Sequence, residues 1–307
     1  MITVGGENLI DFVQTGVDNE LPVFTAVPGG SCYNVAITIA RQNQPVSYVT
    51  PISTDSLGDL LAERLVTDGV ILGTPRSDAP TSLAVVSISN GQPSYQFYRN
   101  KTAERRINAK ILDAAIRNLT KIFHIGSLSL INGEDATCWE RKFQALTRTG
   151  VITSLDPNAR PVAVRDKTSY VDRFRRMAKF ASVLKLSDED LKYIIPDTTV
   201  EDAFDQLYEK AGAQLMILTK GSKGSLVRTP NGQFDAKAVV ANPFRDTVGA
   251  GDTFMGTILV ELYKLNLSVD DLCILSLEKI KVMVERASRA AALNCQTAGC
   301  NPPYGKI

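Results

Sequence analysis

The segment Asp246-Thr247-Val248-Gly249-Ala250-Gly251-Asp252 places a turn of small residues directly before an apolar run at 253–265. Gly249, Ala250 and Gly251 let neighbouring backbone N–H groups converge on one point, and the positive end of the helix predicted over 253–265 adds to that field. Such a turn suits a phosphate or a developing oxyanion, and Asp252 is placed to accept a proton from a nucleophilic hydroxyl. A simple glycine turn with an aspartate N-cap has the same pattern, so both interpretations stay open at this point.

A second glycine turn, in Pro28-Gly29-Gly30-Ser31-Cys32-Tyr33-Asn34, opens another predicted helix. Gly29 and Gly30 allow a ligand to approach the backbone closely, and Asn34 offers both a donor and an acceptor to a hydroxyl. Asp11 ends the first predicted strand, at the edge where ligands bind in open α/β sheets. A loop-to-helix turn and a solvated loop acid are the simpler alternatives for these two features.

Short apolar runs alternate with amphipathic segments along most of the chain. Strands are predicted at 2–10, 46–52, 121–125, 151–155, 182–186 and 214–219, and helices at 33–42, 57–68, 137–149 and 200–210, with further helices at 253–265, 269–275 and 277–297. Strands that alternate with helices favour an α/β fold, in which helices cover both faces of a mostly parallel sheet.

Two hairpin signals break this rhythm, because Asn and Gly tolerate positive φ. Asn90-Gly91 separates apolar runs at 81–89 and 94–100, and Asn231-Gly232 separates 226–229 from 233–240. We predict that 12–27 and about 81–106 form a small β-rich flap, inserted twice into a single domain that spans residues 1–307.

Composition excludes several classes of protein. The 34 basic and 33 acidic residues give a net charge of +1, which argues against partners such as nucleic acid or a membrane surface. Five scattered cysteines and a single histidine, His124, argue against a disulfide framework or a zinc site. No signal peptide or membrane-spanning run is recognisable, so a cytoplasmic protein is expected.

Two common nucleotide-binding motifs do not fit. The segment Thr219-Lys220-Gly221-Ser222-Lys223-Gly224 lacks the spacing of a Walker A loop, and Gly5-Gly6 has no third glycine at the dinucleotide-binding offset. Arg160 follows a predicted strand in Asp156-Pro157-Asn158-Ala159-Arg160, where it could steady a phosphate.

Together, the two glycine motifs resemble the PfkB (ribokinase-like) carbohydrate kinases over nearly the whole chain. Gly29-Gly30 with Asn34 matches the family's sugar-binding pattern, and residues 246–252 match its C-terminal signature. Supporting matches are Asp55 with Gly58, the Asp156–Arg160 stretch, and Thr219-x-Gly221 with Gly224. Residues 7–11, Tyr98-Arg99 with Ala103-Glu104, and Pro302-Pro303-Tyr304 look most like the fructokinase branch.

The resemblance implies a ribokinase-like, doubly wound sheet with a small β-sheet lid, and transfer of the γ-phosphate of ATP, with Mg²⁺, to a hydroxymethyl oxygen. Asp252 would be the base, and the backbone amides of Gly249, Ala250 and Gly251 would form the anion hole. The sugar would be held by Asp11, Gly29, Gly30, Asn34, Arg99 and Arg160. The nucleotide side would be lined by Lys185, Thr219, Gly221, Gly224 and Ser288. The resemblance also leaves room for a monovalent cation such as K⁺, and for a homodimer formed through the lid.

Two departures from the family pattern concern the metal and the adenine. Ser187 and Asp190 stand where the family often has Asn and Glu, so Asp190 is the candidate metal ligand, and Ser288 stands where relatives often have Asn. Fructose is the expected acceptor, and ketodeoxygluconate, ribose or a nucleoside are alternatives. A silent sugar- or nucleotide-binding regulator is the alternative of another class, although such a protein should have lost Asp252 or an adjacent glycine.

Overall fold

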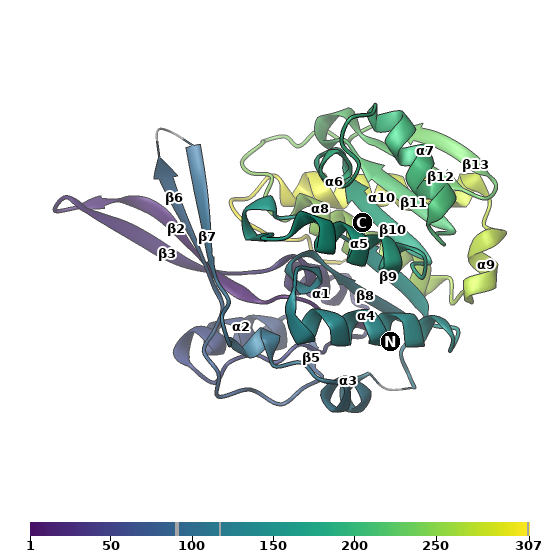
Figure 1. Cartoon of the computed structure of the whole chain (residues 1–307). Helices are drawn as coiled ribbons and strands as arrows, with labels where there is room; N and C mark the ends of the chain where they lie inside the picture. The colour runs from purple at the N-terminus through teal and green to yellow at the C-terminus, as the bar shows by residue number, and fades with distance from the viewer. Residues whose placement is uncertain (90–91, 117, 306) are drawn as a thin grey trace.

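A computed structural model describes residues 1–89, 92–116, 118–305 and 307. A large sheet flanked by helices forms the body, and a smaller sheet projects from one side of it (Figure 1). The large sheet has the order β13-β12-β11-β10-β9-β8-β1-β4-β5. Its strands are β1 (Ile2–Val4), β4 (Val46–Tyr48), β5 (Ile71–Leu72), β8 (Ile122–Gly126), β9 (Ile152–Asp156), β10 (Val183–Ser187), β11 (Leu215–Thr219), β12 (Ser225–Thr229) and β13 (Gly232–Ala236).

Neighbouring strands from β5 to β11 run parallel, and only β12 and β13 are antiparallel to their neighbours. After β1 the chain builds β4 and β5 on one side and then returns to form β8 on the other side. The order therefore reverses at β1, and in sheets of this kind ligands bind at the carboxyl ends of the strands beside such a switch. The expected α/β fold with a mostly parallel, doubly wound sheet is confirmed.

Helices cover both faces of this sheet. They are α1 (Ser31–Arg41), α2 (Ser56–Thr67), α3 (Ala109–Ala115), α4 (Gly133–Thr147), α5 (Lys167–Ala178), α6 (Asp188–Ile194), α7 (Val200–Lys210), α8 (Ala250–Lys264), α9 (Val269–Cys273) and α10 (Leu277–Asn294), with short 3-10 turns at Ala103–Arg105, Ser127–Leu130, Pro161–Ala163 and Gly221–Lys223. One buried apolar cluster packs α1, α2, α8 and α10 against the sheet. A second buried apolar cluster packs the helices α3, α4, α5, α6 and α7 against it. In the described part of the chain, no helix is both long and apolar enough to cross a bilayer.

The smaller sheet has the order β3-β2-β6-β7. It consists of β2 (Leu9–Asp18), β3 (Leu21–Gly29), β6 (Leu83–Ser89) and β7 (Gln92–Tyr98). The hairpin β2–β3 and the hairpin β6–β7 are joined through parallel pairing of β2 with β6. Segments from both predicted insertions therefore make one sheet, which extends away from the helices on the left of Figure 1.

The prediction of a single strand over 2–10 is wrong. The chain forms β1, leaves the large sheet at Gly5–Asn8, and enters the smaller sheet with β2, which begins at Leu9. Gly6 has a φ of 133°, which favours glycine and lets the backbone turn here. Asp11 consequently lies inside β2 and not at the end of a central parallel strand.

The hairpin predicted at Asn231-Gly232 is confirmed by the antiparallel pairing of β12 with β13. The turn predicted at Asn90-Gly91 lies outside the described residues. The remaining predicted helices and strands overlap observed ones, with ends that differ by a few residues.

Candidate active site

The turn before α8 has a left-handed glycine and, within the described residues, backbone N–H groups without a backbone acceptor. Gly249 has a φ of 76°, and a Cβ there would overlap the Cys300 thiol and lie 2.6 Å from its Cβ, so glycine is required. The first hydrogen bonds of the helix run from Thr253 N to Gly249 O at 2.8 Å and from Ala250 N to Thr247 O at 3.1 Å. Within the described residues the N–H groups of Gly251 and Asp252 have no backbone acceptor, as expected at a helix N-terminus.

The C-terminal segment holds this turn in place. Asp246 accepts hydrogen bonds from Val248 N at 2.8 Å and from Gly299 N at 2.9 Å. Asn294, near the end of α10, donates from Nδ2 to Val248 O at 2.8 Å. Because both sides of the turn are tied down, its free N–H groups need little rearrangement to meet an anion.

Asp252 is buried at the first turn of α8 and is held by two donors from α1. Ser31 Oγ donates to its Oδ1 at 2.7 Å, and Asn34 Nδ2 donates to its Oδ2 at 2.8 Å. Burial raises the pKa of Asp252, while the hydrogen bonds from Ser31 and Asn34 and the charge of Lys185 act to lower it. The carboxylate is therefore oriented by hydrogen bonds and desolvated, two properties that suit a general base.

Lys185 and Asp156 form a buried ion pair behind this turn. Lys185, in β10, is 4% exposed, Asp156, at the end of β9, is 1% exposed, and Nζ lies 2.8 Å from Oδ2. Burial alone would lower the pKa of Lys185, but the carboxylates of Asp156 and Asp190 raise it. A Cβ on Gly251 would lie 3.1 Å from Lys185 Nζ, so a positive charge adjoins the backbone of the turn.

Asp11, Gly29 and Arg160 make up a second group at the base of the smaller sheet. The carboxylate of Asp11 lies against Gly29, where a Cβ would overlap it. Burial raises the pKa of Asp11 to about 6, and the charge of Arg160 opposes this shift. Arg160 itself hydrogen-bonds to Asn158 Oδ1 at 2.6 Å.

Asp190, the candidate metal ligand, is the third residue of α6 and hydrogen-bonds back to its N-cap residue, Ser187. Its Oδ2 accepts from the N–H and the hydroxyl of Ser187 at 2.8 and 2.7 Å, and its Oδ1 accepts from Ala159 N at 2.6 Å. Ser187 and Asp190 thus form a capping box, which explains this pair of residues on structural grounds. Nowhere among the described residues do three or more His, Cys, Asp or Glu side chains gather so as to hold a metal ion. The described side chains therefore do not form a metal centre of protein ligands.

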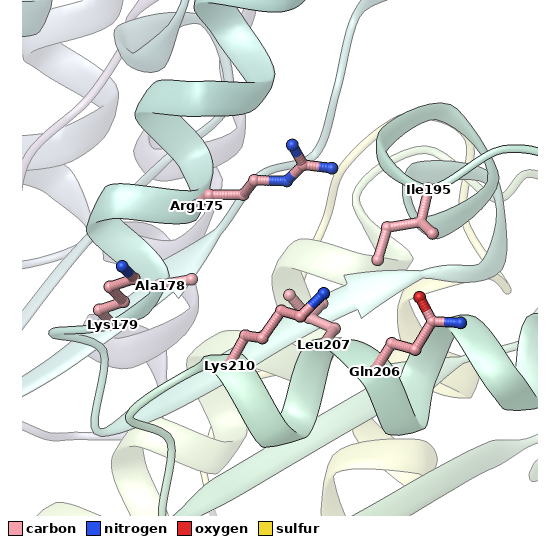
Figure 2. Close-up of a pocket in the computed structure, with 7 residues that line it drawn as sticks. All are labelled: Arg175, Ala178, Lys179, Ile195, Gln206, Leu207 and Lys210. Carbon is pink, nitrogen blue, oxygen red and sulfur yellow. The ribbon is translucent and has the colours of Figure 1, made fainter.

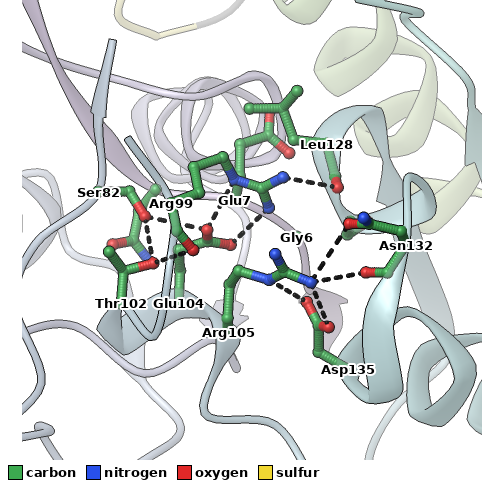
Figure 3. Close-up of polar contacts among 12 residues, drawn as sticks. Gly6, Glu7, Ser82, Arg99, Thr102, Glu104, Arg105, Leu128, Asn132 and Asp135 are labelled. Carbon is green, nitrogen blue, oxygen red and sulfur yellow. Dashed lines mark hydrogen bonds and ion pairs between the residues drawn. The ribbon is translucent and has the colours of Figure 1, made fainter. Parts of the chain in front are cut away.

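The remaining predicted residues lie in different surroundings. Thr219 ends β11, and Gly221 and Gly224 flank the turn that leads into β12, both with positive φ. Ser288 is half-buried on α10. Arg99 follows β7 and is paired with Glu104 through two hydrogen bonds of 2.8 and 3.0 Å, and it also donates to Leu128 O at 3.2 Å (Figure 3).

Sequence reasoning gave no role to Ser31, Asp156 or Glu7. Asp156 had a usable signal, because it ends a predicted parallel strand at the edge where ligands bind. Ser31 and Glu7 had none, since their contacts are with residues far away in the sequence. Ser31 lies 221 positions from Asp252, and Glu7 accepts a hydrogen bond from Ser31 N, 24 positions away.

Two surface pockets lie away from the residues grouped around Asp252 and Asp11. The first, between α5 and α7, is lined by Arg175, Ala178, Lys179, Ile195, Gln206, Leu207 and Lys210 and contains none of the predicted residues (Figure 2). The second lies between β13 and α10 and is lined by residues 234–239 with Lys281, Glu285 and Arg289, of which Arg289 follows Ser288 directly in the sequence.

Known proteins resemble this chain over nearly its whole length. The family model described as pfkB family carbohydrate kinase matches residues 1–306. A fructokinase from Rhizobium leguminosarum bv. trifolii is 35% identical over 274 residues, covering 87% of this chain and 81% of that protein. A probable fructokinase-4 from Arabidopsis thaliana is 31% identical over 311 residues, covering 98% and 93%.

Solved structures agree with the sequence comparison. The crystal structure of a fructokinase with bound ATP from Xylella fastidiosa superimposes with a TM-score of 0.84 at 26% identity, covering 97% of this chain and 93% of that one. The chain therefore has the fold of that kinase and belongs to the pfkB family of carbohydrate kinases, the ATP-dependent sugar phosphotransferases.

Proposed function

We propose that this enzyme transfers the γ-phosphate of ATP to the terminal hydroxymethyl group of fructose, giving fructose 6-phosphate. The observation that carries the proposal is the buried carboxylate of Asp252, held by Ser31 and Asn34 at the free N-terminus of α8. The names of the relatives support fructose as the acceptor.

In this proposal Asp252 orients the sugar hydroxyl and takes its proton as the bond to phosphorus forms. Most of the acceleration in phosphoryl transfer comes from positioning and charge stabilisation, so a carboxylate is a sufficient base. The N–H groups of Gly249 and Gly251, with Lys185 beside them, stabilise negative charge on the transferring group. The N–H of Ala250 is directed to Thr247 O, so it contributes less.

The sugar is proposed to lie between Asn34, the glycines 29 and 30, and Asp11. Asn34 Oδ1 is buried and has no hydrogen-bond partner among the described residues, so it is available to a sugar hydroxyl. Asp11 can accept from two neighbouring hydroxyls. Arg99 and Arg160 stay predicted sugar or phosphate contacts, although Arg99 would need to share its donors with Glu104.

We propose that ATP lies along Lys185, Thr219, Gly221, Gly224 and Ser288, with Mg²⁺ held chiefly by its phosphates and water, as this ion commonly is. Asp190 remains the candidate for a contact with that ion, and K⁺ a candidate activator. In the assay described below, removing Mg²⁺ with EDTA tests the requirement for Mg²⁺, and exchanging K⁺ for Na⁺ tests activation by K⁺.

The smaller sheet is proposed to act as a lid over the sugar, as part of one domain, and to form a homodimer. Val17, Leu21 and Tyr95 are exposed large side chains on it, with exposed fractions of 66%, 68% and 48%. Sedimentation at micromolar protein tests the dimer, and a purely monomeric species contradicts it. All five cysteines are free thiols, which supports a reducing compartment such as the cytoplasm.

A coupled ADP-release assay with fructose, ribose, ketodeoxygluconate and adenosine tests the acceptor. We expect the highest kcat/KM with fructose. A strong preference for ribose or adenosine would overturn the choice of fructose, and no ADP release with any of them would favour a silent binding protein.

A further inference from the structure

Glu7 is a buried acid in the segment that joins β1 to β2. It is 2% exposed, and its Oε1 accepts the backbone N–H of Ser31 at 2.7 Å. A carboxylate this deeply buried is costly unless its contacts compensate for lost hydration. Because Ser31 is the first residue of α1, the carboxylate of Glu7 contacts the start of a helix.

Helix α1 has no cap of its own. Its N-cap residue is Gly30, with a φ of 120° and no side chain to accept a hydrogen bond, and its first turn contains no acidic residue. Glu7 therefore supplies, from another segment, an acceptor at the positive end of α1 and, when it is ionised, a negative charge there. A Cβ on Gly30 would lie 2.6 Å from Glu7 O, so the absent side chain is what lets the two segments approach.

The same helix carries both donors to Asp252. Ser31 Oγ and Asn34 Nδ2 lie about one turn apart on α1, and each contacts a different oxygen of the carboxylate. Both donors reach Asp252 only if the first turn of α1 is fixed in position and rotation. We infer that Glu7 is a positioning residue for catalysis, which anchors the start of α1 so that Ser31 and Asn34 together orient Asp252.

The surroundings of Glu7 fit this role. Burial raises its pKa to about 7, and the N–H of Ser31 and the charge of Arg99 act to lower it. Arg99 is itself fixed by Glu104 and Leu128, beside Glu7 in Figure 3. The arginine that follows β7 thus helps to keep Glu7 charged, and the anchor lies where the smaller sheet joins the body.

This inference rests on the proposed role of Asp252, so its test needs a readout that does not depend on turnover. The carboxyl ¹³C signal of Asp252, assigned by its loss in Asp252→Asn, is titrated in the wild type and in Glu7→Leu, Glu7→Gln and Glu140→Gln. Glu140 is the matched control, because it is an 8%-exposed glutamate that pairs with Arg173 and Arg176 on α5.

We expect Glu7→Leu to raise the pKa of Asp252, because donors that lower it are displaced, and to reduce kcat by about 10- to 100-fold with little change in KM for ATP. Glu7→Gln should shift both in the same direction by less, since its amide oxygen can still accept from Ser31 N. Ser31→Ala should also raise the pKa of Asp252, and combining it with Glu7→Gln should add less than the sum of the two shifts. Glu140→Gln should leave the titration and kcat unchanged.

An unmoved Asp252 titration in folded Glu7→Leu would overturn the inference, and so would loss of kcat that merely tracks a lowered melting temperature. Should the leucine variant not fold, the glutamine variant decides in the same way. A wild-type chain that phosphorylates no sugar would refute the proposed function, while the titration would still decide the role of Glu7.

Discussion

Replacing Lys185 by methionine removes one partner of a buried ion pair while keeping most of the side-chain volume. Lys185 and Asp156 are 4% and 1% exposed and lie 2.8 Å apart. Without Lys185 the carboxylate of Asp156 stays desolvated and loses its counter-charge. Breaking a buried pair in this way costs about 3–5 kcal/mol, so the free energy of unfolding should fall by that amount.

Lys142→Met is the control, because its ion pair has the same distance between nitrogen and oxygen but is exposed to solvent. Lys142 Nζ lies 2.8 Å from Asp113 Oδ1, but the Asp113 side chain is 69% exposed. Exposed pairs contribute less than about 1 kcal/mol, so this variant should be nearly as stable as the wild type. Urea unfolding at pH 7 measures both variants. Equal losses in the two would refute the argument that burial decides the contribution of the pair.

The pH dependence of the difference gives a second check. The folded pKa of Lys185 is raised, because the carboxylates of Asp156 and Asp190 outweigh burial. A group with a raised folded pKa contributes its full stabilisation below the unfolded value, about 10.4 for lysine, and loses it as pH rises through the folded value. The stability gap between wild type and Lys185→Met should therefore be flat from about pH 7 to 9 and shrink in strong alkali. A gap that widens with rising pH would contradict this sign.

Two further substitutions test the glycine turn and the sugar group. Gly249→Ala should lower the free energy of unfolding by at least about 1–2 kcal/mol, because φ is 76° and the new Cβ would overlap Cys300. Gly16→Ala is the control, because no atom lies within 4 Å of its Cβ, and it should change the free energy of unfolding by less than about 1 kcal/mol. Thermal or urea unfolding measures both variants. If the ionised form of Asp11, whose pKa is about 6, holds the sugar, KM for the sugar should rise as pH falls through 6 in the wild type. Asp11→Asn should have a higher KM that is flat between about pH 5 and 8; a wild-type KM that ignores pH in this range would remove Asp11 from sugar binding.

Much of the fold follows from local patterns in the sequence. Apolar runs that alternate with amphipathic segments gave the parallel strands and most helices, because strands buried on both faces are apolar throughout and helices buried on one face are apolar at helical spacing. The run at 2–10 was misread as one strand, since apolar residues stand at both of its ends, while the backbone at Gly6 turns the chain from one sheet to the other. Helix α6 is only seven residues long, so its sequence is too short to show a clear helical period.

The sequence predicted Asp252 and Asn34 as candidate residues, and it did not predict the hydrogen bond between their side chains. Asp252 stood out because glycines precede it and an apolar helix follows it. The donors that orient it come from α1, and nothing in the local sequence marks Ser31 as one of them. Arg99 stays a predicted ligand contact, and its observed ion pair with Glu104 could not be predicted, because no spacing rule applies across the irregular stretch between them.

We propose that the Asp252 carboxylate is the base for phosphoryl transfer. Asp252→Asn keeps the size of the side chain and removes its capacity to take a proton. We predict that kcat falls by about 10²- to 10⁴-fold, while the sugar dissociation constant measured by calorimetry barely changes. An asparagine variant that turns over at the wild-type rate would contradict the account.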